Sequence, residues 1–185
     1  SQMSFPDMNS PIMQQMAFFH EHSMMVIISI IIITMYMIMN MTISFTSWSM
    51  MGQEIEIIWT IIPALKMFFI ALPSLHPLYL KDEIFNAQTS IKIIGHQWYW
   101  SYEYSDFNKE FDSFLIHETE MNINSFRLLQ TDNNLLILFN TMIEFLVTSA
   151  DVIHSWTIPS LGMKMDAVPG RLNQTFTIAK RPGMF

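Results

Sequence analysis

The sequence predicts a two-helix transmembrane hairpin followed by an all-β sandwich domain. Its 185 residues are 51% hydrophobic but only 14% charged, an unusual ratio for a wholly soluble domain. No charged side chain occurs from Ser23 to Gln53, and from Ile57 to Leu80 the only one is Lys66. Each stretch exceeds the roughly 20 apolar residues that a helix needs to cross a membrane. Two buried helices of a soluble core are the alternative, but 185 residues are too few to surround both.

The first span is expected over about residues 23–45. Before it, residues 1–19 contain two prolines, which favour an extended or turning lead-in. His20, Glu21 and His22 at the edge of the span combine side chains that are typical of metal sites. Because neighbouring helical residues do not share a face, we interpret these three residues as the start of an interfacial helix.

The second span is expected over about residues 56–80, where Pro63 and Pro73 should kink or locally open the helix. Glu56 at its start suits the positive end of a helix dipole. Lys66 lies inside the span. A charge at such a position marks either a functional residue or a side chain that snorkels or pairs within a helix bundle.

From Ile91 the apolar residues form short runs separated by turn signals such as the Pro-Gly pair at residues 169–170. Short strands at this spacing predict a β-sandwich. The chain is therefore expected to divide into a membrane hairpin at residues 1–90 and a sandwich at residues 91–185. Because a Pro-Gly turn at residues 182–183 lies so close to the last residue, we expect the sandwich to lack its C-terminal part. The candidate strands are residues 91–104, 114–116, 126–129, 135–140, 143–149, 154–158, 163–166 and 174–179.

The ten residues GHQWYWSYEY at positions 95–104 break strict strand alternation. A strand there places Trp98 and Trp100 on one face and Tyr99 on the other. The aromatic side chains of one face can fill a core, while those of the other face must be covered by another part of the chain or contact a partner. The following segment is acidic, because six Asp and Glu residues between positions 103 and 120 face only Lys109. With a net charge of -7, this disfavours nucleic acid. It suits a cationic partner steered by charge, or it is a solvated acidic loop.

His154 is the candidate metal ligand of the sandwich, in a strand-like segment with Trp156 two residues later. Copper electron-transfer sites use imidazole and soft sulfur ligands. The chain has no cysteine, which excludes disulfides and thiolate ligands within these residues. Met163 and Met165 could supply thioethers, but they are two of 18 methionines and such proximity is expected by chance. A lone histidine is more often structural, and one imidazole cannot hold a metal by itself.

Four long motifs stand out along the chain. They are QEIEIIWTIIPA at residues 53–64, ALPSL at 71–75, GHQWYWSYEY at 95–104 and DVIHSWTIPSLGMKMDAVPGRLNQ at 151–174. In this order they resemble the mitochondrial cytochrome c oxidase subunit II family over nearly the whole chain. The resemblance implies a cupredoxin-like sandwich with a binuclear copper centre. The ending LNQTFTIAKRPGMF resembles the segment just before the family's cysteine loop, which carries most of the copper ligands, so the centre is expected to be incomplete in this chain.

The resemblance also implies roles for individual residues. His154 matches the first copper-binding histidine of the family. Trp98, with Tyr99 beside it, matches the tryptophan through which an electron enters from cytochrome c. Glu56 matches a carboxylate near the mouth of a proton pathway into the catalytic subunit. The acidic positions that match the docking surface for the basic cytochrome are Glu103, Asp112, Asp132 and Asp151.

The function implied by the resemblance is electron transfer from cytochrome c, through the copper centre, to the haem-copper subunit I that reduces oxygen to water and translocates protons. The implied location is the mitochondrial inner membrane, crossed twice, with the sandwich in the intermembrane space. Subunit I, other oxidase subunits and the lipid bilayer are the further partners. Two alternatives remain: a copper-free subunit II of the quinol-oxidase type, and a membrane-anchored module that acts only in assembly or binding. Lys66 departs from the family, which usually has an apolar residue there.

Overall fold

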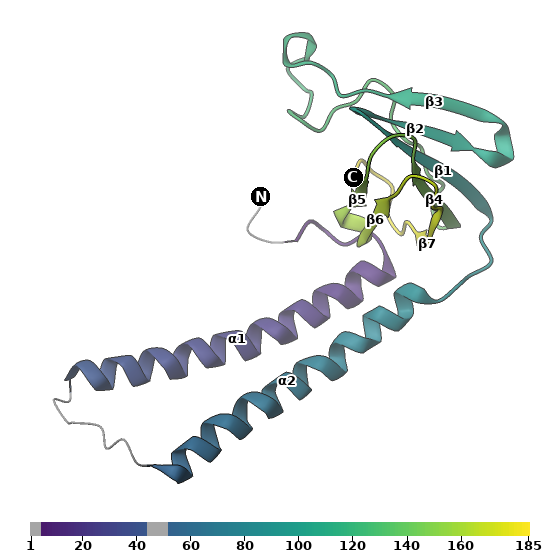
Figure 1. Ribbon diagram of the computed structural model, residues 1–185. Helices are drawn as coiled ribbons and strands as arrows, with labels where there is room; N and C mark the ends of the chain where they lie inside the picture. The colour runs from purple at the N-terminus through teal and green to yellow at the C-terminus, as the bar shows by residue number, and fades with distance from the viewer. Residues whose placement is uncertain (1–4, 44–51) are drawn as a thin grey trace. The chain divides into compact units, whose positions relative to one another are not determined.

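The computed structural model describes residues 5–43 and 52–185 (Figure 1). The chain forms two compact units, one from Gln15 to Leu80 and the other from Lys81 to Phe185 together with the N-terminal segment up to Gln14. The first unit is a pair of helices and the second is built around two β-sheets. The predicted fold class of a membrane-type helical pair followed by a β-sandwich is confirmed.

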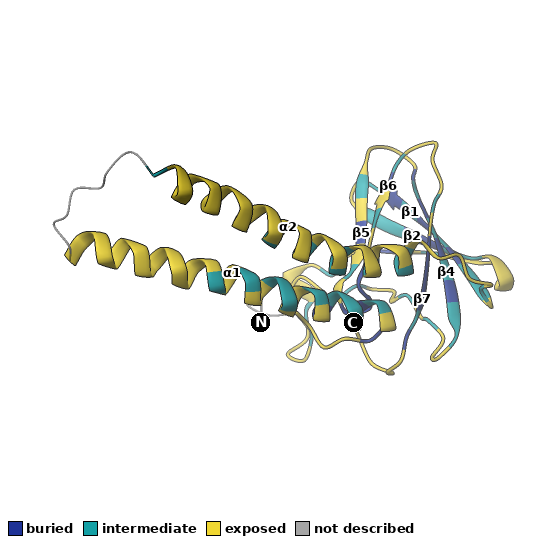
Figure 2. Ribbon diagram, turned by 90° about the horizontal axis from the view of Figure 1, so that it is seen from below, coloured by how far each residue is buried: buried dark blue, intermediate teal, exposed yellow. Residues whose placement is uncertain are grey.

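The helical unit is formed by α1 (Pro11–Ile43) and α2 (Gln53–Asp82). Both are long and apolar enough to cross a membrane, and they are exposed over most of their length (Figure 2). An uncovered apolar helix surface of this kind belongs against lipid or other protein. The two predicted apolar helices are thus present, and the bounds of the membrane-spanning parts stay a prediction; residues 44–45 of the first predicted span lie outside the described part of the chain.

Helix α1 begins twelve residues earlier than the predicted span, so the extended lead-in predicted up to residue 19 is wrong from Pro11 onward, whereas residues 5–10 are non-helical as predicted. The Ser10 hydroxyl accepts a hydrogen bond from the Met13 backbone N–H at 3.0 Å, which caps the helix, and Pro11 occupies its first position. The interpretation of residues 20–22 as a helix start is also wrong, because they lie inside α1.

His22 has a structural role that follows from a proline in the facing helix. Three prolines lie inside α2, and the helix is continuous through all of them. Since Pro73 has no N–H, the Phe69 carbonyl four residues earlier loses its helical donor. The Nε2 of His22 reaches that carbonyl at 3.3 Å, and because a carbonyl only accepts, the imidazole donates. This bond replaces the one that proline removes.

The second unit has a five-stranded sheet in the order β3-β2-β1-β4-β7 and a two-stranded sheet of β5 and β6. Strands β1 and β4 are parallel, and every other pair is antiparallel. Three short 3-10 helices, η1 to η3, lie in the connections. The bounds are β1 Thr89–His96, β2 Tyr99–Tyr104, η1 Ser105–Phe107, β3 Lys109–Ser113, η2 Glu118–Glu120, β4 Met142–Ser149, β5 His154–Ile158, η3 Pro159–Leu161, β6 Met163–Ala167 and β7 Asn173–Ile178.

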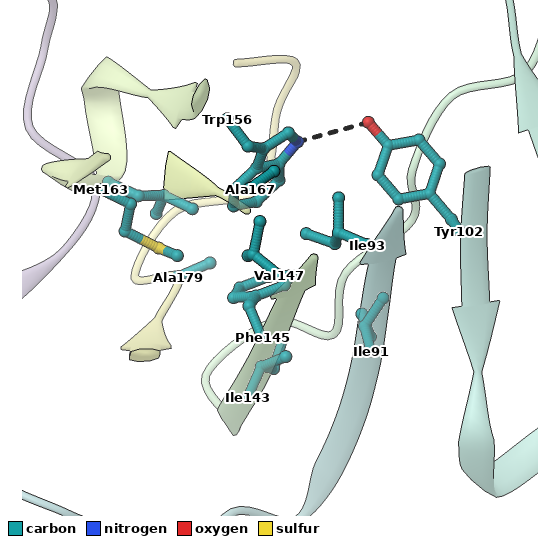
Figure 3. Close-up of a cluster of buried hydrophobic side chains, with 11 residues drawn as sticks. Ile91, Ile93, Tyr102, Ile143, Phe145, Val147, Trp156, Met163, Ala167 and Ala179 are labelled. Atoms are coloured by element: carbon teal, nitrogen blue, oxygen red, sulfur yellow. Dashed lines mark hydrogen bonds between the residues drawn. The ribbon is translucent and has the colours of Figure 1, made fainter. Parts of the chain in front are cut away.

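The core lies between the two sheets (Figure 3). Every second residue of β4 points into it, and Ile143, Phe145 and Val147 are completely buried. From the small sheet, the ring of Trp156 packs 5.1 Å from that of Phe145. Trp156 Nε1 donates a 3.4 Å hydrogen bond to the Tyr102 hydroxyl, which satisfies a buried indole N–H. Burial raises the pKa of Tyr102, so the phenol stays neutral.

Four of the predicted strands agree with the structure to within a residue at each end: 143–149, 154–158, 163–166 and 174–179. The predicted strand 91–104 is two strands joined by a turn. Residues 126–129 form a turn in which Leu128 has a φ of 62°, and residues 114–116 and 135–140 contribute only isolated bridges. Strand β3 was missed, since its sequence KEFDS is mostly polar.

The N-terminal segment packs within the sandwich unit. Asn9 is almost fully buried, and its backbone N–H and C=O bond the Ser160 carbonyl and the Lys180 N–H, each at 2.8 Å. The Ser10 hydroxyl also donates to the Leu161 carbonyl at 2.7 Å. The first turn of α1 is therefore fixed to η3, directly after the strand that carries His154.

This packing depends on Gly162, and it predicts a specific loss of stability. Gly162 has a φ of +69°, and a Cβ there would lie 3.1 Å from the Met13 Cα. Gly170 has a similar φ of +75°, but a Cβ there would have no neighbouring atom within 4 Å. Gly170→Ala should therefore cost only the conformational penalty of about 1–2 kcal/mol. Gly162→Ala adds a backbone clash that brings the loss to about 3 kcal/mol or more.

Denaturant unfolding of the two purified variants, side by side with the unchanged chain, measures both free energies of unfolding. Equal losses at the two glycines would contradict the contact between Met13 and Gly162.

Candidate functional site

Trp98 stands at the tip of the β1–β2 hairpin. His96 and Tyr99 form the last residue pair of the ladder, so Gln97 and Trp98 are the two turn residues, and the peptide bond between them is cis. The Trp98 side chain is 90% exposed, with no ring contact or side-chain hydrogen bond to the described residues. An indole presented in this way is suited to contact another molecule.

The residue next to it is held in place by stacking. The ring of Tyr99 lies between those of His96 and Phe114, with centroids 4.5 Å away on each side and interplanar angles of 5° and 24°. Tyr99 is half-buried. Thus the exposed, unpacked Trp98 lies in the turn between His96 and Tyr99, two members of an aromatic stack.

His154 begins β5 and lies over the backbone of Gly95 in β1. A Cβ at position 95 would come within 2.9 Å of the His154 Cδ2 atom, so only glycine allows the imidazole to approach this closely. The ring of Trp100 meets that of His154 edge-on at 5.8 Å. The imidazole is 19% exposed, which leaves one side open to the surface.

Asp151 connects the histidine to the hairpin turn. Its Oδ1 accepts hydrogen bonds from His154 Nε2 at 2.7 Å and from the Val152 N–H at 2.6 Å. Its Oδ2 accepts one from the Gln97 N–H at 2.7 Å. The bond from His154, followed by those from Val152, Gln97 and the Ser149 hydroxyl, holds the pKa of Asp151 well below its usual range. The carboxylate is therefore ionised and joins the two halves of the site.

This arrangement fixes the chemistry of the imidazole. Because the ionised carboxylate only accepts hydrogen bonds, Nε2 must carry the proton. With its proton on Nε2, the imidazole can offer the Nδ1 lone pair to a metal ion, and no group among the described residues hydrogen-bonds Nδ1. A carboxylate behind a histidine in this manner is the usual support of a metal ligand. His154 therefore fits the role of one copper ligand.

The described residues do not complete a metal site. No group of three or more His, Cys, Asp or Glu side chains in residues 5–43 and 52–185 is arranged to hold a metal ion. Met163 is 3% exposed and belongs to the hydrophobic core, and Met165 packs against that core. No contact among the described residues places either thioether beside His154.

Three of the predicted docking acids lie near the hairpin turn. Asp151 bonds the turn itself. Asp132 Oδ1 accepts the Phe114 N–H at 2.8 Å, which places it beside the aromatic stack. Asp112 Oδ1 accepts the Ser101 hydroxyl at 2.7 Å, on the strand that follows the turn. The structure therefore brings these three carboxylates to the same end of the sheet.

The remaining predicted site residues are elsewhere. Glu103 lies further along β2 and forms an ion pair with Lys92 across the β1–β2 ladder, with Nζ and Oε2 2.9 Å apart. Its charge is thus partly compensated. Glu56 is exposed in the first turn of α2, in the helical unit.

Family models match both parts of the chain. The model for the periplasmic domain of cytochrome c oxidase subunit II matches residues 89–185, and the model for its transmembrane domain matches residues 1–76. The chain belongs to the cytochrome c oxidase subunit II family. As a member it is a membrane protein and a component of an oxidoreductase, the oxidase complex, in which it assembles with other subunits.

The chain is similar to known subunits of this family and to one solved structure. Cytochrome c oxidase subunit 2 of Rhipicephalus sanguineus is 71% identical over 100% of this chain and 83% of its own length. The subunit 2 of Simulium vittatum is 52% identical over 100% of this chain and 82% of its length. The solved periplasmic domain of subunit II of cytochrome oxidase of Bradyrhizobium japonicum is 44% identical, covers 55% of this chain and 70% of that chain, and has a TM-score of 0.49.

In this subunit II, sequence reasoning proposes His154 and Trp98 as site residues but misses the hydrogen bonds that connect them through Asp151. It assigns Asp151, three residues before His154, only to a docking surface. The spacing itself is a signal, since an Asp three residues before a histidine can turn back to bond its ring. The role of Gly95, which lies 59 residues before His154 in the sequence, has no local signal.

Proposed function

We propose that this subunit II receives electrons from cytochrome c at Trp98 and Tyr99 and delivers them to the haem-copper subunit I. A binuclear copper centre would lie between the two, with His154 as one ligand. In this proposal residues 1–90 form the membrane hairpin in the mitochondrial inner membrane. Residues 91–185 form the copper domain in the intermembrane space.

One observation supports the proposal more than any other. The carboxylate of Asp151 accepts hydrogen bonds both from the backbone N–H of Gln97, the residue before Trp98, and from the imidazole of His154. These two bonds hold the exposed aromatic turn close to His154, the proposed metal ligand, as short-range electron transfer would require.

In this proposal, individual residues of the chain have separate roles in electron and proton transfer. Trp98 contacts the cytochrome, while the stacked ring of Tyr99 keeps the turn in position. His154 would keep Nδ1 free for copper, because its Nε2–H donates a hydrogen bond to the Asp151 carboxylate. Copper, when bound, supplies one-electron redox chemistry. Glu56, exposed at the start of α2, would pass protons toward subunit I.

The proposal is tested by mixing reduced cytochrome c anaerobically with the intact oxidase that contains this subunit. We expect rapid one-electron reduction of its copper, followed by haem, in stopped-flow spectra. Haem reduction by a quinol but not by cytochrome c would indicate the copper-free alternative. Absence of copper together with normal assembly would indicate a module without an electron-transfer role.

The docking acids predict a salt-dependent association rate. Asp112→Asn and Asp132→Asn should each lower the rate of cytochrome c association roughly two- to threefold at low salt, because they remove charge that steers a basic partner. Both remain clean charge variants, since the amide oxygen of asparagine can still accept the bonds now made by Oδ1. The effect should fade as salt screens the charges. A loss that does not change with salt would contradict steering.

A further inference from the structure

Lys66 is the only charged residue between Ile57 and Leu80, and the structure shows where its ammonium group lies. Its Nζ donates to the Ser29 hydroxyl of α1 at 3.2 Å. This is its only contact of this kind with the described residues, and none of their ion pairs includes it. Because an ammonium has three donors, two of them have no acceptor in this part of the chain.

The depth of Lys66 in the span argues against snorkelling. It lies ten residues after Glu56 and fourteen before Leu80, about 15 Å and 21 Å along a helix that rises 1.5 Å per residue. Lysines that snorkel lie near helix ends. The side chain of Lys66 instead bends across to the facing helix, so its charge stays within the span.

Lys66 and Ser29 also mark where the two helices cease to cover each other. Both are half-buried, whereas residues 30–43 of α1 and 53–65 of α2 are all exposed (Figure 2). Lipid tails can cover apolar side chains, but they offer no acceptor to an ammonium. Whatever lies against this surface must therefore supply one.

We propose that Lys66 pairs with a carboxylate on a transmembrane helix of another oxidase subunit, which packs against the uncovered parts of α1 and α2 beside Ser29. An acid fits better than a neutral acceptor, because a charge in a low-dielectric setting needs a counter-charge. The two helices have no acid of their own at this depth, because Glu21 lies eight residues before Ser29 in α1, about 12 Å along the helix. The acids of α2 are Glu54, Glu56 and Asp82, which lie toward its ends. Phospholipid phosphates are held at the membrane surface, too far from the middle of the span.

Zero-length cross-linking of the intact oxidase tests the contact directly. A membrane-permeant carbodiimide joins an amine to a carboxylate only when the two touch. We expect mass spectrometry to find Lys66 linked to an Asp or Glu in a transmembrane segment of another subunit. A link from Lys66 only to residues of this chain, or no link at all, overturns the proposal.

Matched variants test the same contact through assembly. Lys66→Met keeps the length of the side chain but leaves the partner acid unpaired, and should lower the amount of this subunit retained in the complex about tenfold. Lys81→Met, at the end of the same helix, should have no effect. Lys66→Glu combined with lysine at the cross-linked acid should restore assembly.

Two further outcomes would contradict the proposed pairing of Lys66. Unchanged assembly of Lys66→Met overturns the proposal, and so does a loss of bound anionic phospholipid without loss of a subunit contact. The proposal rests on assembly into the oxidase and not on copper. If Lys66 makes no such contact but cytochrome c still reduces the copper, only the Lys66 proposal fails. If cytochrome c does not reduce the copper but the Lys66 contact is found, only the electron-transfer proposal fails.

Discussion

Trp98→Ala is expected to slow electron entry from cytochrome c by about 100-fold, equivalent to ~2.7 kcal/mol of barrier, with much less effect on cytochrome binding. The side chain is 90% exposed and unpacked, so its removal leaves the sandwich core intact. The rate of electron transfer falls steeply with distance. Loss of the indole lengthens the path from the cytochrome to His154, which Asp151 holds close to the turn. The defect should therefore appear in the rate at saturating cytochrome and not in the concentration needed for saturation.

Stopped-flow reduction of the intact oxidase over a range of cytochrome concentrations separates the two effects. Trp98→Phe keeps an aromatic ring at the tip and should recover part of the rate. Ile123→Ala is a suitable control, because Ile123 is a fully exposed apolar residue of the same unit and its truncation removes surface without touching the turn. An unchanged saturating rate in Trp98→Ala would exclude this residue as the entry point.

The sequence predicted those parts of the fold that have a repeating apolar pattern. In β4 the alternation of Ile143, Phe145 and Val147 matches the residues that are completely buried, because a half-buried strand needs that period. The two helices follow from the length of their apolar runs. Strand β3 was missed because KEFDS has no such pattern; it forms by pairing with β2 through backbone hydrogen bonds that any sequence can make.

The residues of the candidate site could be proposed from the sequence, but the contacts between them could not. His154 and Trp98 carry unusual side chains in distinctive motifs, so sequence alone could single them out. The bond from the Gln97 N–H to Asp151 joins residues 54 positions apart, and the close approach of His154 to Gly95 depends on strands that are adjacent only after folding. Likewise, the start of α1 at Pro11 was hidden by polar residues that pack on η3.

The contacts of Asp151 indicate a positioning role that the sequence analysis missed, and this role predicts the second large effect. Asp151→Ala should lower copper affinity in the intact subunit about 10- to 100-fold, the usual cost of losing the partner behind a metal-bound histidine. The physical reason is twofold. Without the carboxylate, Nε2 of His154 loses the acceptor that fixes the tautomer with Nδ1 free. The Gln97 N–H also loses its hydrogen bond to residue 151.

Asparagine variants separate positioning from docking. Asp151 uses both carboxylate oxygens, and asparagine has only one acceptor oxygen, so Asp151→Asn must lose either the Gln97 or the His154 bond. Asp132→Asn makes the same change in charge but keeps its acceptor, because both backbone N–H groups bond Oδ1 alone. Competition for copper against a chelator should therefore show a weakened site in Asp151→Asn and an unchanged one in Asp132→Asn.

The exchange rate of the Gln97 amide hydrogen provides a second measurement that does not depend on copper. It should rise in Asp151→Ala, because a lost hydrogen bond exposes that N–H, and remain slow in Asp132→Asn. If both variants instead bind copper normally and differ from the unchanged subunit only in a salt-dependent association rate, then Asp151 acts as a docking charge. In that case the carboxylate between the aromatic turn and His154 has no part in shaping the copper ligand.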